Sequence, residues 1–371
     1  MDSRPGALED LVIEKEFWLG KRVFLTGHTG FKGAWMSLLL RSLGAEVHGY
    51  ALPPEDDEGI FVVAHVMDDV HHCIGDIRNL DFLRAALKEA QPYVVIHMAA
   101  QSVVRRSYAA PIETYATNVM GTVNLLEAVR HVPTIAAVVV VTSDKCYMNV
   151  GWPWGYRESD SLGGHDPYSN SKACAELVTA GYRSSFFHAI GATRIATVRA
   201  GNVIGGGDWA QDRLVPDAMR AFFADEALHI RNPQSVRPWQ HVLDPILGYL
   251  MLARRLAEGE PEFADSWNFG PNIAGERTVR DVADTIVRLW SGSARWVKDG
   301  GDHPHEASYL KLDCSKAHAK LGWHSLIDFE QALQLTVEWY GGLKKRDDMR
   351  AMTLSQIARV AGSRVAEPSN V

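Results

Sequence analysis

Ser143, Asp144 and Lys145 place a hydroxyl, a carboxyl and an amine side by side, just after an apolar run. The run, residues 136–141, contains only small and β-branched residues, which is typical of a strand buried on both faces. Groups of these three kinds at the end of a strand could bind a substrate and move its protons. A surface ion pair at a strand end is the alternative interpretation.

Tyr168 and Lys172 form a second pair of candidate groups, in the segment YSNSK. Residues four apart share one face of a helix, so the phenol and the ammonium are expected to lie close together. A neighbouring cation favours the phenolate, so Lys172 with an oxidised nicotinamide ring would lower the pKa of Tyr168 toward neutrality. Tyr168 is therefore predicted to be a general base, although many Tyr-x-x-x-Lys pairs are only solvated helix faces.

The segment TGHTGFKG near the N-terminus could hold a pyrophosphate. Its glycines have the spacing G-x-x-G-x-x-G, and it lies between an expected strand and an expected helix. Backbone N–H groups of such a turn, together with the helix N-terminus, can approach phosphate oxygens closely. The predicted dinucleotide contacts in this turn are Gly27, Thr29, Gly30, Phe31, Lys32 and Gly33.

The turn leaves the choice between NAD and NADP open. A carboxylate at the end of the second strand would favour NAD, but residues 50–52 are Tyr, Ala and Leu. His28 and Lys32 would even tolerate an additional phosphate. Further cofactor contacts are expected where the third and fourth strands end: Asp76 and Ile77 at the adenine, and Ala99, Ala100 and Gln101 at the nicotinamide ribose.

Short β-branched runs alternate with longer helical segments through the first half of the chain. Uniformly apolar strands that alternate with helices predict a parallel sheet covered on both faces, the doubly wound α/β or Rossmann fold. The expected strands are residues 21–26, 46–52, 70–77, 92–100, 136–143 and 193–200. The expected helices are residues 33–44, 80–90, 112–132 and 170–187.

A second, smaller C-terminal α/β lobe is predicted after residue 201, where the loop GGGDW breaks the alternation. The expected helices there are 214–227, 278–290 and 328–340, with a strand at 227–233, and residues 267–272 would return to the main sheet. We therefore predict a dinucleotide-binding Rossmann domain of residues 17–200 and 239–272, a substrate-binding domain of residues 201–238 and 273–355, and terminal extensions at 1–16 and 356–371.

The composition argues against several classes of protein. With 38 Lys and Arg against 45 Asp and Glu, the net charge is −7, and no basic run suggests a nucleic-acid partner. No stretch reaches about 18 apolar residues and no signal-peptide pattern opens the chain, so we expect no membrane role and a cytoplasmic location. The four cysteines, Cys73, Cys146, Cys174 and Cys314, lack disulfide or metal spacing and are interpreted as buried small apolar residues.

His303, His305 and Glu306 come nearest to a metal motif. His303 and His305 stand two positions apart, and no third ligand has a suitable spacing. No metal site is therefore expected.

Five segments together resemble the extended short-chain dehydrogenase/reductase family of nucleotide-sugar enzymes. They are TGHTGFKG, HMAAQSVVRRSY, TNVMGT, TSDKCY and YSNSK, within a resemblance that extends over roughly residues 17–355. The resemblance implies a Rossmann fold, NAD as cofactor and a nucleotide-sugar substrate. TSDKCY and SVRPWQHV are similar to segments of the family's 4,6-dehydratases, most of all the group that acts on CDP-glucose.

The resemblance also implies a reaction. In a 4,6-dehydratase the sugar gives a hydride from C4 to the cofactor, loses water across C5 and C6, and regains the hydride at C6. By this resemblance Tyr168 takes the O4 proton, Ser143 hydrogen-bonds O4 and Asp144 protonates the departing O6. Dehydratases of the dTDP type have a Glu after that Asp as the C5 base, whereas this chain has Lys145. Lys145 could be that base if its pKa were lowered, or an electrostatic partner of Asp144 or the enolate, and we favour the second role.

A nucleoside diphosphate needs cationic partners. Arg237 and Arg213 are the candidates because a guanidinium pairs bidentately with phosphate, although Arg237 could instead cross-link loops. The resemblance adds Ser102, Asn202 and Leu214 to the predicted substrate contacts. It also implies a homodimer, or a dimer of dimers, through helices 112–132 and 170–187, whose apolar faces could equally be covered within one chain.

Three other functions stay open on the sequence. A nucleotide-sugar 4-epimerase uses the same tyrosine, lysine, hydroxyl and cofactor but needs no acid beside Ser143. A dehydratase for another nucleotide-activated hexose fits the same motifs. A non-catalytic dinucleotide sensor on this fold is the third alternative, and an intact set of Ser143, Tyr168 and Lys172 argues against it.

Overall fold

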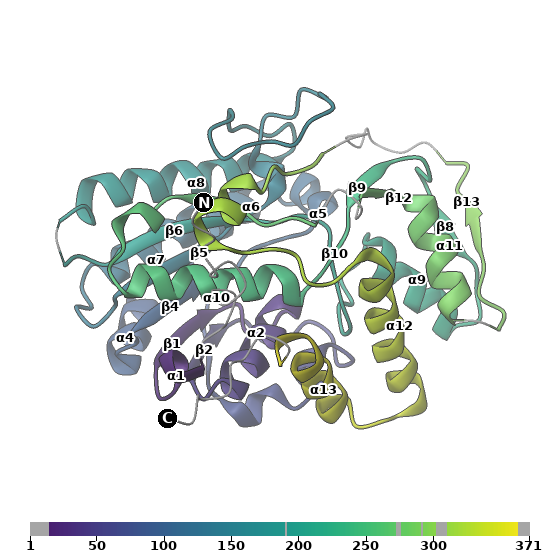
Figure 1. Ribbon diagram of the computed structural model, residues 1–371, viewed down its shortest axis with the longest axis horizontal. Helices are drawn as coiled ribbons and strands as arrows, with labels where there is room; N and C mark the ends of the chain where they lie inside the picture. Colours follow the sequence, from purple (N-terminus) through teal and green to yellow (C-terminus); the bar gives the residue numbers. More distant parts are fainter. Residues whose placement is uncertain (1–14, 190, 272–275, 291, 302–309, 363–371) are drawn as a thin grey trace, which may run out of the picture.

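The computed structural model describes residues 15–189, 191–271, 276–290, 292–301 and 310–362. Its centre is a seven-stranded parallel sheet with the order β11-β6-β5-β4-β1-β2-β3 (Figure 1). The strands are β1 (Arg22–Thr26), β2 (Glu46–Ala51), β3 (Val70–Ile74), β4 (Val94–His97), β5 (Ala137–Val141), β6 (Arg194–Arg199) and β11 (Ser266–Asn268). The predicted Rossmann sheet is confirmed, and β11 returns to it by pairing with β6 in parallel, as predicted.

Helices cover both faces of the sheet because its strands carry apolar side chains on both faces. Val23 and Leu25 of β1 belong to the core on the side of α2 (Phe31–Ser42) and α10 (Leu243–Ala257). Phe24, between them, belongs to the opposite core. That core is closed by α4 (Leu80–Ala90), α7 (Gly121–Val129) and α8 (Pro167–Phe186).

The predicted helix at 112–132 is divided into several pieces. It consists of α6 (Pro111–Tyr115), a π-helical turn η2 (Ala116–Met120) and α7, and the short helix α5 (Val104–Ala109) precedes it. The predicted helix at 170–187 begins earlier, at Pro167, because Asp166 caps it by accepting a hydrogen bond from the Ser169 N–H. Tyr168 therefore lies in the first turn of α8.

Helix α10 was missed from the sequence. Its segment LDPILGYLMLARRLA is buried on nearly every side, because it packs on β5 and β6 and against α2. A helix that is apolar all round shows no amphipathic period, and Pro245 and Gly248 weaken the helical signal further.

The second lobe contains three small two-stranded sheets, grouped with α9, α11 and α12 at one end of the molecule (Figure 1). The strand pairs are β7 (Val203–Ile204) with β10 (Gln240–His241), β8 (Leu228–Ile230) with β13 (Trp296–Lys298), and β9 (Val236–Pro238) with β12 (Glu276–Thr278). The helices are α9 (Leu214–Phe223), α11 (Val279–Trp290) and α12 (Phe329–Lys345).

Helix α13 (Met349–Ala361) crosses the predicted boundary at residue 355 and packs on α2 and α3 (Ile60–Val63) of the first lobe. The predicted division into domains therefore stays a prediction, with its last boundary inside a helix. The remaining short elements are α1 (Lys15–Trp18), η1 (Val66–Asp69), η3 (Asp144–Cys146), η4 (Pro261–Phe263) and the π-helical η6 (Ala317–Leu321). Residues 303–306 and most of the terminal extension predicted at 356–371 lie outside the described residues.

The cysteines match their interpretation only in part. Cys146 and Cys314 are buried, but Cys73 and Cys174 are half-buried, and all four are free thiols. Across the described residues, no helix is both long and apolar enough to cross a bilayer.

Beneath the strand ends lies a buried ion pair between Glu176 of α8 and Arg199 of β6, each 2% exposed. The Glu176 carboxylate accepts hydrogen bonds from Arg199 Nε (2.9 Å) and Nη2 (2.8 Å), and from the hydroxyls of Thr142 and Thr197. Burial alone would raise the pKa of Glu176, but the hydrogen bonds and charge of Arg199 outweigh it and the pKa is lowered. The pair therefore stabilises the fold at neutral pH, and this stabilisation is lost as the pH falls through the folded-state pKa.

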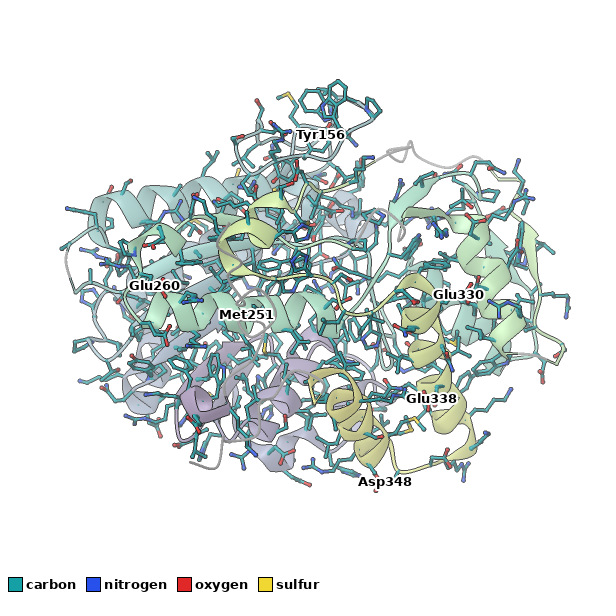
Figure 2. The ribbon with its side chains drawn as sticks, viewed as in Figure 1. Tyr156, Met251, Glu260, Glu330, Glu338 and Asp348 are labelled. Carbon is teal, nitrogen blue, oxygen red and sulfur yellow. The ribbon has the colours of Figure 1, made fainter. Side chains whose placement is uncertain are left out.

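Replacing Glu176 with Gln should lower the free energy of unfolding by at least about 3 kcal/mol, because Arg199 is left buried without a counter-charge. Urea denaturation at neutral pH measures the loss. The matched control is Glu330→Gln on α12 (Figure 2), which breaks an exposed pair with Arg288 and should cost less than about 1 kcal/mol. Equal costs for the two variants would contradict the role given to the buried pair.

Candidate active site

A cleft of about 1580 Å³ lies at the carboxyl ends of the parallel strands, between the sheet and the second lobe. Parallel strands bring their carboxyl ends to one edge, where loops from different strands meet. All of the site residues predicted from the sequence line this one cleft. Their individual roles stay predictions, and the local geometry shows what each can do.

The glycine turn is packed too closely for side chains at two of its positions. Gly27 has φ = 77°, and a Cβ there would lie 2.8 Å from the backbone nitrogen of Ala99. A Cβ at Gly33 would lie 2.1 Å from the carbonyl oxygen of Gly27. Gly30 is the N-cap of α2 and no side chain caps this helix end, so the helix N-terminus faces the cleft with backbone donors only. This cradle fits a pyrophosphate.

The loop after β4 is held by buried polar contacts. Thr26 Oγ1 hydrogen-bonds His97 Nδ1 (2.7 Å) and accepts from the backbone N–H of Ala99 (3.2 Å). Burial lowers the pKa of His97 to about 3, so its ring is neutral. Asn118, in the π-helical turn, accepts from the Gln101 N–H (2.8 Å) and donates to its carbonyl (2.9 Å). Sequence reasoning missed Asn118, although its segment TNVMGT carried part of the family resemblance.

At the predicted adenosine end, Asp76 is already engaged by a neighbour. Its carboxylate accepts two hydrogen bonds from Arg78 Nε (3.0 and 2.9 Å), and these bonds from Arg78 lower the pKa of Asp76. Tyr50, at the end of β2, donates to the carbonyl of Asp76 (2.9 Å). The suggestion that His28 could accommodate an extra phosphate is wrong: its ring is fully buried against His72, 2.6 Å between ring nitrogens, and it does not line the cleft.

Ser143 is the N-cap of the short turn η3, which follows β5 and contains Asp144 and Lys145. The Ser143 hydroxyl donates to Asp144 Oδ1 (3.0 Å), and Lys145 Nζ lies 3.5 Å from the same oxygen. Asp144 is completely buried, and its Oδ2 has no hydrogen-bond partner among the described residues. A Cβ at Gly201, after β6, would lie 1.9 Å from Oδ2, so glycine is needed opposite this carboxylate. One carboxylate oxygen is therefore unengaged in the wall of the cleft.

Tyr168 and Lys172 both reach the cleft from α8. A lowered phenol pKa was predicted for Lys172 acting together with an oxidised nicotinamide ring, and this stays a prediction. Burial raises the pKa of Tyr168 to about 12, opposed by a hydrogen bond with Ser143. Lys172 Nζ donates instead to the Val141 carbonyl (3.2 Å), and burial lowers its pKa to about 8.

The electrostatic environment of Lys32 is shaped by several neighbours. Burial, followed by the positive charges of Arg213 and Lys172, lowers its pKa to about 8. The carboxylates of Asp144 and Asp208 act in the opposite direction. Cationic side chains from three elements therefore converge near Asp144, which makes this end of the cleft suitable for anionic ligands or developing negative charge.

Four of the five residues predicted to contact a substrate belong to the second lobe, and the fifth, Ser102, follows β4 in the first lobe. Arg213 donates to Asp208 (2.8 Å) and to the Ser102 hydroxyl (2.9 Å), and Leu214 begins α9 beside it. Asn202 has φ = 43°, and its Nδ2 has no hydrogen-bond partner among the described residues.

Three further arginines border the same part of the cleft. Arg237 of β9 lines it and donates to the Val236 carbonyl (3.0 Å). Arg105 and Arg231 lie 3.1 and 3.7 Å from Asp212 and were not predicted. A visible signal for Arg231 was its place directly after the short strand LHI.

Comparison with known proteins gives consistent matches along the chain. A family model described as GDP-mannose 4,6 dehydratase matches residues 24–336. The CDP-glucose 4,6-dehydratase of Salmonella typhimurium is 51% identical over 354 residues, covering 94% of this chain and 98% of that protein.

Solved structures match the fold. A UDP-glucose 4-epimerase from Thermotoga maritima, with UDP-glucose, has a TM-score of 0.76 at 19% identity, covering 87% of this chain and 99% of that chain. A dTDP-glucose 4,6-dehydratase from Bacillus anthracis, in complex with NAD, has a TM-score of 0.72 at 24% identity, covering 90% and 100%.

Gly33→Ala should destabilise the protein by at least about 2 kcal/mol, because its Cβ would overlap the Gly27 carbonyl. The direction of this change in stability is informative, because a Gly→Ala substitution inside a helix normally stabilises a protein by up to about 1 kcal/mol. Chemical denaturation measures the change. Gly30→Ala is the matched control, because its Cβ would lie 3.5 Å from the same oxygen, and it should change stability by less than about 1 kcal/mol. A stable Gly33→Ala protein would contradict the packing of this turn.

Proposed function

The chain belongs to the GDP-mannose 4,6-dehydratase family, and from this premise we propose that it converts CDP-D-glucose to CDP-4-keto-6-deoxy-D-glucose with loss of water. Such a conversion makes it a hydro-lyase in the biosynthesis of deoxysugars. The assignment of cytosine as the nucleotide base and of glucose as the sugar rests on the relative that is 51% identical, which is named CDP-glucose 4,6-dehydratase.

The observation that carries the proposal is the buried carboxyl of Asp144 between Ser143 and Lys145. A 4-epimerase needs a base, a hydroxyl and a cofactor at C4, but no acid near C6. Asp144 lines the cleft with one oxygen unengaged, beside the hydroxyl of Ser143 and on the same side as Tyr168. Elimination of the C6 hydroxyl requires a proton donor at that place.

NAD is the cofactor that the site fits. The glycine cradle suits a pyrophosphate, the loop of Ala99 and Gln101 is held open by Thr26 and Asn118, and a related fold contains NAD. When bound, NAD supplies an acceptor for the C4 hydride and returns that hydride to C6. Lys172 stands at this end of the cleft and, with a pKa near 8, carries its positive charge at neutral pH. That charge favours a phenolate at Tyr168 once the sugar is in place.

The first half of the reaction depends on Tyr168 and Ser143. Tyr168 accepts the proton from the sugar O4 hydroxyl, and Ser143 hydrogen-bonds the same oxygen and orients it. Burial keeps the phenol protonated in the free protein, with a pKa of about 12. In the proposed reaction, the positive charge of Lys172 therefore has to help lower the pKa of Tyr168 when the ligands are bound.

The second half depends on Asp144 and Lys145. The 4-keto group makes the C5 proton acidic enough for a base to remove it, and Asp144 in its protonated form gives a proton to the O6 hydroxyl, which leaves as water. Lys145 lies 3.5 Å from Asp144 Oδ1, which places its ammonium to stabilise the carboxylate and the negative charge of the enolate. Lys145 is therefore assigned an electrostatic role.

The diphosphate of the substrate would lie along the arginines of the second lobe. Arg213, Arg231 and Arg237 all border the cleft there, and guanidinium groups bind phosphate oxygens bidentately. The amide Nδ2 of Asn202 is an additional donor.

We also propose a homodimer, in which α6–α7 and α8 pair with their copies. Large apolar side chains are exposed on these helices, including Ile112 (85%) and Leu177 (61%). A cytoplasmic enzyme is consistent with four free thiols and with CDP-glucose as the substrate.

The decisive measurement is the mass of the product after incubation with CDP-, UDP-, GDP- and dTDP-glucose, each with and without added NAD. We expect the CDP sugar to lose one water and the others to react at least about ten-fold more slowly.

Asp144→Asn should bind CDP-glucose but form product about 10²- to 10⁴-fold more slowly, because the proton donor is gone. A new sugar epimer of unchanged mass would make the protein a 4-epimerase and leave Asp144 without this role.

Lys145→Arg and Lys145→Met separate the two roles of Lys145. If Lys145 acts by charge, the Arg variant should keep turnover within about ten-fold of wild type, while the Met variant should lose about 100-fold or more. Product formation and exchange of the C5 proton with deuterated solvent are the measurements. An Arg variant as inactive as the Met variant, in both product formation and C5 exchange, would make Lys145 the C5 base instead.

A further inference from the structure

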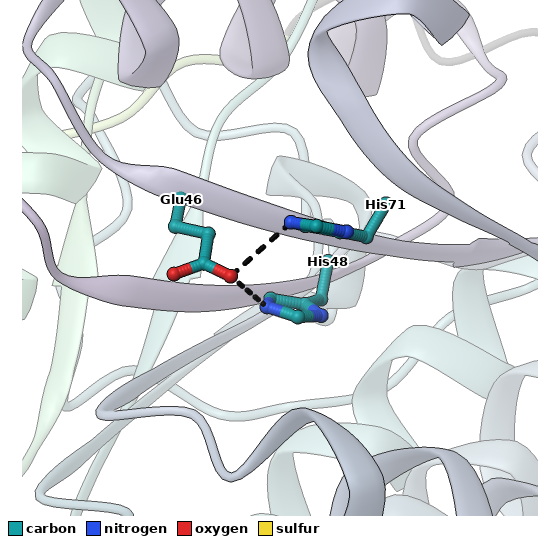
Figure 3. A group of neighbouring side chains, drawn as sticks. All are labelled: Glu46, His48 and His71. Atoms are coloured by element: carbon teal, nitrogen blue, oxygen red, sulfur yellow. Dashed lines mark hydrogen bonds and ion pairs between the residues drawn. The ribbon is translucent and has the colours of Figure 1, made fainter.

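Glu46, His48 and His71 form a cluster at the amino-terminal ends of β2 and β3 (Figure 3). His48 Nε2 and His71 Nε2 lie 3.2 and 3.1 Å from the same oxygen, Oε1 of Glu46. The cleft lies at the opposite ends of these strands, and none of the three residues lines it. The cluster is therefore separate from the proposed active site.

The backbone sets the position of all three side chains. His48 and His71 are direct partners in the parallel pairing of β2 with β3, so their side chains leave the sheet at the same level. Their rings stack with centroids 4.4 Å apart and an interplanar angle of 16°. Glu46 precedes His48 by two residues on the same strand and so lies on the same face. Sheet register therefore brings the three groups together.

The ligand atoms have the spacing that a small cation needs. All three lie within 4.8 Å of one another. Two ligands of one tetrahedral zinc ion, each about 2.1 Å from the metal, are about 3.4 Å apart, close to the distances between the carboxylate oxygen and each ring nitrogen. The side chains of Glu46, His48 and His71 are 42%, 19% and 63% exposed, which leaves an entry path and room for a water as fourth ligand.

We propose that Glu46, His48 and His71 bind one divalent transition-metal ion, with zinc as the best fit, and that the ion joins the edge strand β3 to β2. Two imidazoles and one carboxylate favour zinc, copper or nickel, whereas magnesium and calcium prefer oxygen ligands alone. The proposal is independent of the proposed reaction. His71 and Asp76 are five residues apart, about 16 Å along an extended strand, so the ion would not touch the predicted adenosine site.

A metal that binds only the folded protein stabilises it by mass action. Because β3 pairs on one side only, a ligand bridge to β2 would hold the edge of the sheet where it is otherwise least restrained. If zinc binds, the melting temperature of the protein should therefore rise with the logarithm of the free zinc concentration.

The test uses the full chain without a histidine tag, treated with a chelator and dialysed, and then titrated with Zn²⁺ by calorimetry. The wild-type protein should bind one equivalent of Zn²⁺. His71→Ala and Glu46→Gln should each lower the zinc affinity by at least about 10-fold, because loss of even a residue that only hydrogen-bonds a ligand costs that much affinity. His71 is the most exposed of the three, so its replacement should leave the fold intact. Glu46→Gln keeps the size of the side chain and removes only the charge.

The matched control is His324→Ala, which removes one ring of another stacked pair, His318 and His324, with centroids 4.5 Å apart. Within the described ranges this pair has no third ligand close enough to complete a metal group. His324→Ala should therefore bind zinc as wild type does. A crystal grown with Zn²⁺ should show an anomalous peak between the three ligand atoms. Absence of binding by wild type, or His71→Ala and Glu46→Gln proteins with wild-type affinity, would overturn the proposal and leave Glu46 as a shared hydrogen-bond acceptor.

Discussion

The carboxylate of Glu176 holds together the elements that carry the active site. It lies on α8 four residues after Lys172, and it binds Arg199 at the end of β6 and the hydroxyl of Thr142 at the end of β5. Arg199 in turn donates to the Tyr147 hydroxyl (2.6 Å), which donates to Asn268 of β11 (2.8 Å). One buried charge pair thus fixes the strand that presents Ser143 and Asp144 relative to the helix that presents Tyr168. Such a pair costs desolvation, and what it provides here is a fixed position of the reacting groups.

Burial of the candidate catalytic side chains determines their protonation. Tyr168 and Lys172 are both buried, so the charged form of each is disfavoured: the pKa of the phenol rises to about 12 and that of the ammonium falls to about 8. Lys32 shares the lowered value near 8. Positive charge brought near Tyr168 would lower its pKa, and negative charge brought near Lys172 or Lys32 would raise theirs.

The parts of the molecule that repeat a periodic pattern could be predicted, and the parts that depend on contacts distant in sequence could not. The six apolar runs predicted six strands of the sheet, and TGHTGFKG and YSNSK placed the beginnings of α2 and α8 to within a few residues. Helix α10 was not predicted because a helix that is buried on nearly all sides has no polar stripe. The raised pKa of Tyr168 escaped because i+4 spacing brings Lys172 onto the same face but does not reveal that its ammonium bonds the Val141 carbonyl. The role of Gly201 is visible only when the end of β6 is placed beside β5.

The close approach of Gly201 to Asp144 bears on how one fold can carry out two reactions. The proteins matched by fold include both 4-epimerases and 4,6-dehydratases, and the Tyr-x-x-x-Lys pair and glycine turn suit either reaction. What a dehydratase needs in addition is room for a carboxyl group beside the C4 hydroxyl site. Here Gly201 supplies the room, since any Cβ would occupy the place of Asp144 Oδ2, and Asn202 turns the chain away with φ = 43°. If Asp144 is the acid of the proposed reaction, the glycine after β6 is therefore required with it, because only glycine leaves space for this carboxyl group.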